Sequence, residues 1–262
     1  LNSSRQIAAT LNGLGLVYAA QGNYKGALEY LESSLQLARE ISDLLGEANT
    51  LVNLGTVQES LGNYYDALDI YEQTSVVYQE LNNSLGHSVS LQNIGGIYLA
   101  LGRLNTALDI YQQSLGIMQE INSVEGVAEL SGNIASIYSR QGKAQEALNL
   151  YEQSLRINRE IGDREGELIV LNSMGTLHLS QDNYSEAIDL FRQSLDIAQE
   201  IGDKSGESYA LHNIGSVYRN QSNYSDALHN YQRSIEIAYE VGDREGAAMR
   251  LYNLALLLFN SF

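Results

Sequence analysis

Residues 44–71 read LLGEANTLVNLGTVQESLGNYYDALDIY, and this stretch outlines two consecutive helices. Leu51 and Gly55 mark one face of a first helix, which the pattern places at about residues 44–60. The Leu-Gly-Asn sequence at residues 61–63 breaks that helix, and a second helix begins after Asn63 and ends near residue 81. Because connections this short make neighbouring helices antiparallel, the stretch predicts an antiparallel pair of amphipathic helices.

The same pattern returns every forty residues along the chain, without a change of register. Leucine recurs at Leu11, Leu51, Leu91, Leu171, Leu211 and Leu251, and glycine at Gly15, Gly55, Gly95, Gly175 and Gly215. In the second helices, alanine recurs at Ala27, Ala67, Ala107, Ala147, Ala187 and Ala227, and a large side chain follows four residues later at Leu31, Tyr71, Tyr111, Tyr151, Phe191 and Tyr231. We expect each glycine to allow close approach of the second helix and each large side chain to fill the space that remains.

This repetition predicts an all-α fold of about 13 helices. Six helix pairs are followed by a lone first helix at about residues 244–260, with junctions near residues 42, 82, 122, 162, 202 and 242. We interpret residues 1–262 as one α-solenoid. Since the chain opens with Leu1 in the middle of the pattern, we expect it to be a fragment of a longer protein.

Cap residues support the helix boundaries. Gly162, Gly202 and Gly242 each end a second helix, and the aspartate that follows each of them is expected to cap the next helix. An Asn-x-x-acid capping box is expected to open second helices at Asn63, Asn183 and Asn223.

The repeat unit resembles the tetratricopeptide repeat (TPR). Leu14, Gly15 and Tyr18 match the L-G-x-x-Y core of its first helix, and the alanine and aromatic pair matches its second helix. A leucine replaces the usual tryptophan, and the proline that ends each unit is absent. The forty-residue unit resembles the branch found in kinesin light chain, LGN and bacterial peptide-sensing regulators. This resemblance implies a right-handed superhelix whose first helices line a concave groove that binds partners.

Composition excludes several classes of function. The chain has 15 basic and 32 acidic residues and a net charge of −17, so we expect no nucleic-acid partner. It has no cysteine and no apolar run long enough to span a membrane, and this composition fits a cytoplasmic protein. We expect no cofactor and no metal.

No catalytic arrangement stands out, and the sequence predicts that the chain is not an enzyme. It has four histidines, and none has a second histidine four residues later. His178 takes a position that tyrosine fills in other repeats, which favours a packing role, and His212 is expected to face the groove.

Asparagine recurs on the face of the first helices that should line the groove. We call this set, Asn53, Asn93, Asn133, Asn213 and Asn253, the asparagine ladder. An amide side chain donates and accepts hydrogen bonds, as a peptide unit does, and equivalent asparagines in the related adaptors hold a ligand's main chain. The alternative is that duplication copied an asparagine that bonds only to its neighbouring repeat or to water.

The ladder predicts the length and the mode of binding of a peptide. If neighbouring first helices lie about 10 Å apart, the ladder spans roughly 50 Å, or about 15 extended residues. Arg140 and Arg219 are the main cations of the predicted groove, and no lysine lies there. We therefore expect a partner that is extended and held along its main chain, and not by its C-terminus.

The last helix has an apolar stripe made of Met249, Tyr252, Leu256 and Phe259 on the face that carries polar residues elsewhere. One interpretation is that the lone helix has lost its partner helix. The other is that the stripe anchors a hydrophobic segment of the ligand or a second copy of the chain.

Three functions remain open from the sequence: a peptide-binding adaptor, a structural or self-associating scaffold, and a sensor array of a larger signalling enzyme. The first is favoured. The acidic excess lies mostly on second helices and junctions, as at Glu40, Glu80, Glu120, Glu160, Glu200 and Glu240. It is interpreted as a solvated surface, with a docking face for a basic partner as the alternative.

Overall fold

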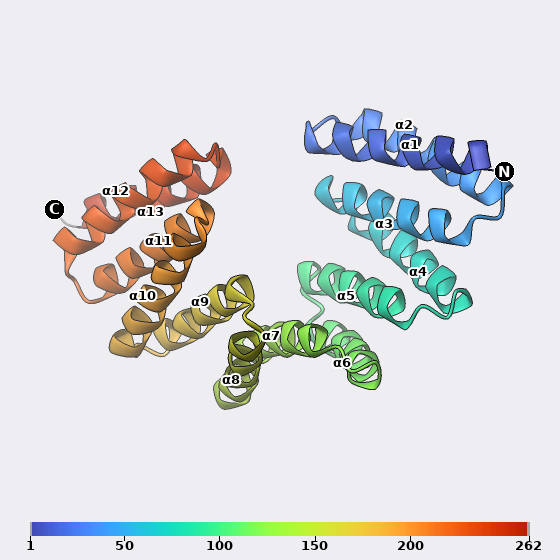
Figure 1. Cartoon of the computed structure of the whole chain (residues 1–262). Coiled ribbons are helices and arrows are strands. Elements are labelled where there is room, and N and C mark those ends of the chain that lie inside the picture. The colour runs from blue at the N-terminus through green and yellow to red at the C-terminus, as the bar shows by residue number, and fades with distance from the viewer. Residues whose placement is uncertain (1, 261–262) are drawn as a thin grey trace. The chain divides into compact units, whose positions relative to one another are not determined.

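The computed structural model describes residues 2–260, and it describes side chains as far as Leu258. This part of the chain forms thirteen α-helices (Figure 1). They are α1 (Asn2–Ala20), α2 (Tyr24–Glu40), α3 (Leu44–Ser60), α4 (Tyr64–Glu80), α5 (Ser84–Ala100), α6 (Leu104–Glu120), α7 (Val124–Arg140), α8 (Ala144–Ile161), α9 (Arg164–Ser180), α10 (Tyr184–Ile201), α11 (Lys204–Asn220), α12 (Tyr224–Glu240) and α13 (Arg244–Asn260). The all-α prediction and its helix count are confirmed, and odd-numbered helices are the first helices of the repeats.

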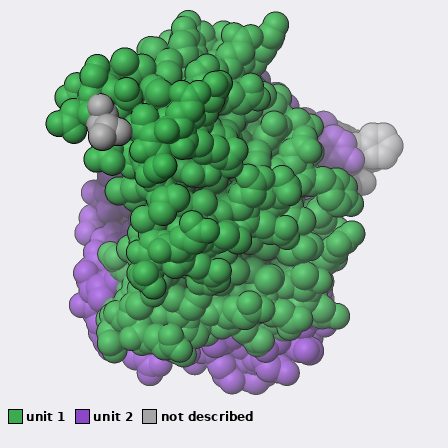
Figure 2. Space-filling model, turned by 90° about the vertical axis from the view of Figure 1, so that its right-hand side faces the viewer, with its two compact units in different colours: residues 1–130 green, residues 131–262 purple. Residues whose placement is uncertain are grey.

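Two compact units divide the chain, residues 1–130 and residues 131–262, coloured separately in Figure 2. The division falls within α7. In each unit, first helices pack against the second helices that follow them, as α3 does against α4 and α9 against α10. None of the described helices is long and apolar enough to cross a membrane.

The turns between helices depend on one residue each with positive φ. Glycine takes this conformation at seven turns, including Gly162, Gly202 and Gly242 as predicted. Serine, asparagine or aspartate takes it at five others, for example Ser42 with a φ of 54° and Asn82 with a φ of 51°. Asparagine and aspartate tolerate this region better than most side chains, so these turns keep their geometry without glycine.

Aspartate caps open several first helices as expected. Asp163 accepts a hydrogen bond from the Gly166 amide at 2.9 Å, and Asp203 and Asp243 do the same for Gly206 and Gly246. Of the predicted capping boxes, only the asparagine half forms, at Asn223, whose side chain accepts from the Asp226 amide; the Asn223 backbone N–H donates to Tyr218 instead of to Asp226, and no side-chain cap forms at the other two asparagines. Asn63 instead donates to Gln58 Oε1 at 2.8 Å, and Asn183 turns toward the preceding turn and His178, so neither caps its helix.

The core repeats with the sequence. The six alanines of the second helices are completely buried, and the large side chains four residues later are at most 5% exposed. Glycine provides the space for these side chains: a Cβ atom added to Gly175 would lie 2.6 Å from a ring carbon of Phe191, closer than packed atoms can approach. The predicted role of the repeated glycines is confirmed at this position.

Buried hydroxyl groups join the two helices of a pair. Ser34 donates to the carbonyl oxygen of Ala8 at 2.8 Å, and Ser234 donates to that of Ser208 at 2.6 Å. Ser88 and Ser114 bond in the same way, and every one of these bonds spans 26 residues. Because the groups are buried, the bonds satisfy polar atoms that water does not reach.

Candidate functional site

The asparagine ladder lies on first helices, half-buried at every position. Two of its members hydrogen-bond to the preceding repeat: Asn53 Nδ2 donates to Asn12 Oδ1 at 2.9 Å, and Asn253 Nδ2 lies 3.3 Å from His212 Nε2. In both cases the partner lies 41 residues earlier. These two amides therefore bond to the neighbouring repeat, as the alternative to a ligand-binding role proposes.

The remaining members differ. The side chains of Asn93 and Asn133 form no hydrogen bond with other side chains or backbone in the part of the chain that the structure describes. Asn213 Nδ2 is buried, again without a partner among the described residues. The fold therefore does not use the amide groups of these three residues in the way that it uses those of Asn53 and Asn253.

A pocket of about 630 Å³ lies within residues 131–262. Its walls come mainly from first helices: Arg140 from α7, Asn172 and Ser173 from α9, and Tyr209 from α11. Tyr151 of α8 and Arg250 of α13 complete it. We call it the α9 pocket, because α9 contributes more of its residues than any other helix. Of the predicted groove residues, this places Arg140 in a concave site.

Helix α9 offers mainly hydrogen-bond acceptors to the pocket. Ser173 and Thr176 donate their hydroxyl protons to carbonyl oxygens of their own helix, at 2.9 Å in both cases, so their oxygens can act only as acceptors toward other groups. Asn172 is 5% exposed and donates to Ser194 Oγ, while its own Oδ1 is buried without a partner. The pocket can thus accept hydrogen bonds from the N–H groups of a ligand.

Arg250 is a pocket residue that the sequence analysis missed. It is 5% exposed, and its Nη1 donates to Asp243 Oδ2 at 3.0 Å, whereas its Nε is buried without a partner among the described residues. The corresponding residues of the other repeats are small or apolar, namely Thr10, Thr50, Ser90, Leu130, Val170 and Ala210. The signal in the sequence was an arginine at a repeat position that otherwise holds small or apolar residues.

His212 does not face an open groove as expected, because it is 8% exposed and packs against the Tyr231 ring at 5.2 Å between centroids. Burial, followed by the charges of Arg250 and Arg219, lowers the pKa of His212 to about 4. The imidazole is therefore neutral at pH 7. Arg219 itself donates to Asn220 at 3.4 Å, and it is not among the residues that line the α9 pocket.

The apolar stripe of α13 is partly exposed. Met249 is 50% exposed and Tyr252 is 64% exposed, while Leu256 is half-buried and the Phe259 side chain lies outside the described residues. Met249 occupies the repeat position of Ile169 and Tyr209, both of which line the α9 pocket. The stripe therefore begins at a repeat position that contributes to the pocket in earlier repeats.

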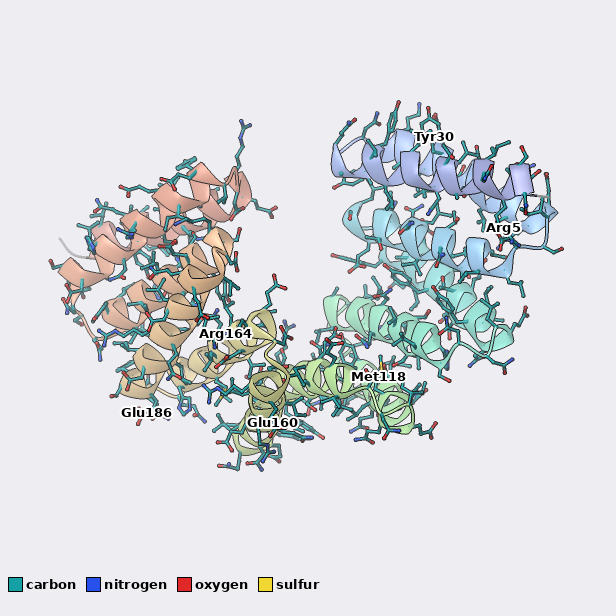
Figure 3. All side chains as sticks on the ribbon, viewed as in Figure 1. Arg5, Tyr30, Met118, Glu160, Arg164 and Glu186 are labelled. Carbon is teal, nitrogen blue, oxygen red and sulfur yellow. The ribbon has the colours of Figure 1, made fainter. Side chains whose placement is uncertain are left out.

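The exposure of the acidic residues depends on their position in the repeat. The glutamates that end second helices are exposed, and Figure 3 labels two exposed acids, Glu160 on α8 and Glu186 on α10. In contrast, Glu167 and Glu207 are buried and paired: Arg159 and Arg164 bind Glu167, and Lys204 binds Glu207. Arg164, also labelled in Figure 3, pairs with Glu200 as well. Most basic residues near buried acids are thus already neutralised.

Sequence comparison gives one match that covers most of the chain. A sequence model of the tetratricopeptide repeat family matches residues 6–80, 47–120 and 126–200. A model of anaphase-promoting complex subunit 5 matches residues 173–261. A search of the curated proteins gave no match.

Solved structures share the fold. BtubC (BKLC) from P. vanneervenii is 20% identical, with a TM-score of 0.71 over 82% of this chain and 90% of that one. A signal transduction ATPase with numerous domains and a tetratricopeptide repeat sensor, from Pyrococcus horikoshii, is 15% identical, with a TM-score of 0.74. That match covers 97% of this chain and 39% of the ATPase. A Rap protein complexed with Competence and Sporulation Factor is 14% identical, with a TM-score of 0.68 over 95% and 74% of the two chains.

Proposed function

Because the chain belongs to the tetratricopeptide repeat family, whose members generally act as protein–protein interaction modules, we propose that it binds an extended peptide segment of a partner protein. The peptide lies against the first helices, where the asparagine ladder and the α9 pocket present polar side chains. The chain performs no catalysis in this proposal.

One observation carries the proposal: polar atoms on the first helices lack partners within the fold. Asn172 Oδ1 and Asn213 Nδ2 are buried and unpaired among the described residues. A buried polar atom without a hydrogen bond costs roughly 1 to 3 kcal/mol. An extended peptide offers N–H and C=O groups at regular spacing, which is the chemistry that these side chains need.

The α9 pocket supports the same ligand class. Its α9 wall accepts hydrogen bonds, while Arg140 and Arg250 donate them, so both groups of a peptide unit find a counterpart. Ile169 is 61% exposed and Tyr209 is 43% exposed, and together they provide apolar contact for a side chain of the peptide. A site of this mixed composition suits a peptide better than a purely apolar ligand.

The experiment is selection from a library of random peptides of about 15 residues, displayed on phage and panned on the purified chain. Selected peptides are then synthesised with a fluorescent label, and their affinity is measured by anisotropy. Peptides that bind the wild type and lose affinity for the Asn93→Ala, Asn133→Ala double variant support the proposal. Failure to enrich any peptide, or binding that ignores the first-helix variants, refutes it.

A sensor array within a larger signalling protein is the second candidate. It rests on the structural likeness to the Pyrococcus horikoshii ATPase, of which this chain spans 39%. Peptide binding is compatible with it, since a sensor also needs a ligand. The two differ in whether ligand binding alters a linked domain, which activity measurements on the parent protein with and without a selected peptide decide.

A further inference from the structure

The α9 pocket differs in charge from the chain around it. The protein has a net charge of −17, yet the described residues that line this pocket include two arginines and no carboxylate. A pocket that lacks acids in so acidic a chain favours an anionic group in the ligand.

Arg140 is the cation available to such a group. It is exposed at the end of α7, and it forms no ion pair or hydrogen bond within the part of the chain that the structure describes. Arg159, Arg164 and Lys204 lie in the same unit, and each already pairs with a glutamate. Arg140 is therefore free to bind a ligand without losing a contact that the fold uses.

The charge of the pocket matches one negative charge. Arg250 also lines it, but Asp243 lies 3.0 Å from Arg250 Nη1 and neutralises that guanidinium. The uncompensated charge of the pocket is then that of Arg140 alone. A planar guanidinium binds a carboxylate through two parallel hydrogen bonds, and a singly charged carboxylate balances it, whereas a phosphate dianion would leave excess negative charge.

Two buried groups add a requirement for neighbouring polar atoms. Asn172 Oδ1 lacks a hydrogen-bond donor and Arg250 Nε lacks an acceptor among the described residues. Both residues are only 5% exposed. An acidic side chain of a peptide has main-chain N–H and C=O groups next to it. The N–H group can donate to Asn172, and the C=O group can accept from Arg250.

We propose that the α9 pocket selects peptides with an acidic side chain, whose carboxylate pairs with Arg140 while the adjacent main chain bonds to Asn172 and Arg250. The proposal rests on the proposed function, because it names the chemistry of the peptide that the chain binds. It assigns Arg140 the role of a specificity determinant. It does not involve the C-terminus of the peptide.

The test compares peptide selection on three proteins: the wild type, Arg140→Glu and Arg156→Glu. Arg156 is the matched control, since it is exposed on α8 in the same unit, and its replacement changes the net charge equally. The peptides, about 15 residues long, are fused to phage through their C-termini, so no free terminal carboxylate is offered. Melting temperatures of the variants establish that both fold.

We expect peptides rich in Asp or Glu to be enriched on the wild type and on Arg156→Glu, but not on Arg140→Glu. An equal preference for acidic peptides on Arg140→Glu, or peptides enriched without any acidic preference, overturns the inference and leaves the proposed function standing. If no peptide is enriched on any of the proteins, the proposed function fails and this inference fails with it.

A double-mutant cycle then places the contact. Replacing the selected Glu of a peptide by Gln should weaken binding to the wild type about tenfold. The same replacement should not weaken binding to Arg140→Glu and should strengthen it, because it removes a like-charge repulsion. A tenfold loss on both proteins would place the carboxylate elsewhere and contradict the proposal. Free glutamate at millimolar concentration should not displace the peptide; displacement would assign the pocket to a small free acid.

Discussion

The side-chain amide of Asn53 donates a hydrogen bond to the amide oxygen of Asn12 in the preceding repeat, at 2.9 Å. Asn93 and Asn133 occupy the same repeat position but have no such partner among the described residues. Their counterparts 41 residues earlier explain the case of Asn93, because Val52 cannot accept a hydrogen bond from its side chain. One repeated residue type thus joins repeats at some positions and remains free at others.

This division predicts opposite effects for two asparagine variants. The Asn93→Ala, Asn133→Ala variant should lose about 1 to 3 kcal/mol of peptide affinity with little change in melting temperature, because the fold does not use these amides. Asn53→Ala should instead lower stability by about 1 kcal/mol, since Asn12 loses its partner. Thermal unfolding and anisotropy with a selected peptide measure both quantities. Lost stability with intact affinity in the double variant would assign these asparagines to the scaffold.

Glycine variants should separate close packing from helix propensity. Gly175→Ala should destabilise the protein by about 1 to 3 kcal/mol, because the new Cβ would collide with the Phe191 ring. Gly132→Ala, in the same unit, should stabilise it by about 1 kcal/mol, since its nearest neighbour is Ser154 Oγ at 3.6 Å and alanine favours the helix. Denaturant unfolding measures both changes. A Gly175→Ala protein as stable as the wild type would contradict the packing argument.

His212 should make stability depend on pH. Its pKa is about 4 in the folded chain and about 6.5 in the unfolded chain, so the unfolded state binds the proton more tightly. The stabilising contribution is complete above about pH 6.5 and is lost as the pH falls to about 4, by roughly 3 kcal/mol. Arg219 and Arg250 face the imidazole and oppose its protonation, while Asn253 and Tyr231 contact it.

The variant that tests this is His212→Asn, because Asn172 occupies the same position one repeat earlier. Unfolding free energies at neutral pH and near pH 4 should differ less in the variant than in the wild type. His178→Asn, the same replacement at a less buried histidine, is the control for the loss of an imidazole as such. Identical pH profiles for His212→Asn and the wild type would show that His212 is not the titrating group.

The exposed part of the apolar stripe should affect binding more than stability. Met249→Ser with Tyr252→Ser should reduce the affinity of a selected peptide severalfold, because both side chains are at least half exposed and Met249 continues the position of Ile169 and Tyr209. Leu257→Ser should reduce stability instead, since Leu257 is 1% exposed. Sedimentation of the double variant tests the alternative that the stripe joins two copies of the chain; dissociation of an oligomer without a loss of affinity would favour that alternative.

The helix bounds were predicted closely because the same pattern of residues recurs in every repeat. The first helix expected at about residues 44–60 is α3, Leu44–Ser60, and the lone helix expected at about residues 244–260 is α13, Arg244–Asn260. The turn at residues 61–63 and the close contacts at Gly175 followed from the same repetition. Side-chain capping was harder to predict, since Asn63 has two possible hydrogen-bond partners and only geometry selects Gln58.

The site was less predictable because it depends on departures from the repeat. Comparison of equivalent positions in the repeats predicts the asparagine ladder. It does not predict which of these side-chain amides hydrogen-bond to another repeat. Arg250 is a single exception among small and apolar residues, and repeat averaging conceals such a residue. His212 was placed in the groove by helical angle alone, whereas its position lies close to the next first helix and is buried by it.

The hydroxyl bonds that span 26 residues have a consequence for how such a chain can change over generations. Each of these bonds begins and ends inside one helix pair, as the bond from Ser34 to Ala8 does. A gene that gains or loses one forty-residue segment by unequal recombination therefore keeps every such bond closed, because donor and acceptor travel together. The number of repeats can then change while each repeat keeps its own packing. The length of the partner segment that the first helices can contact changes with the number of repeats.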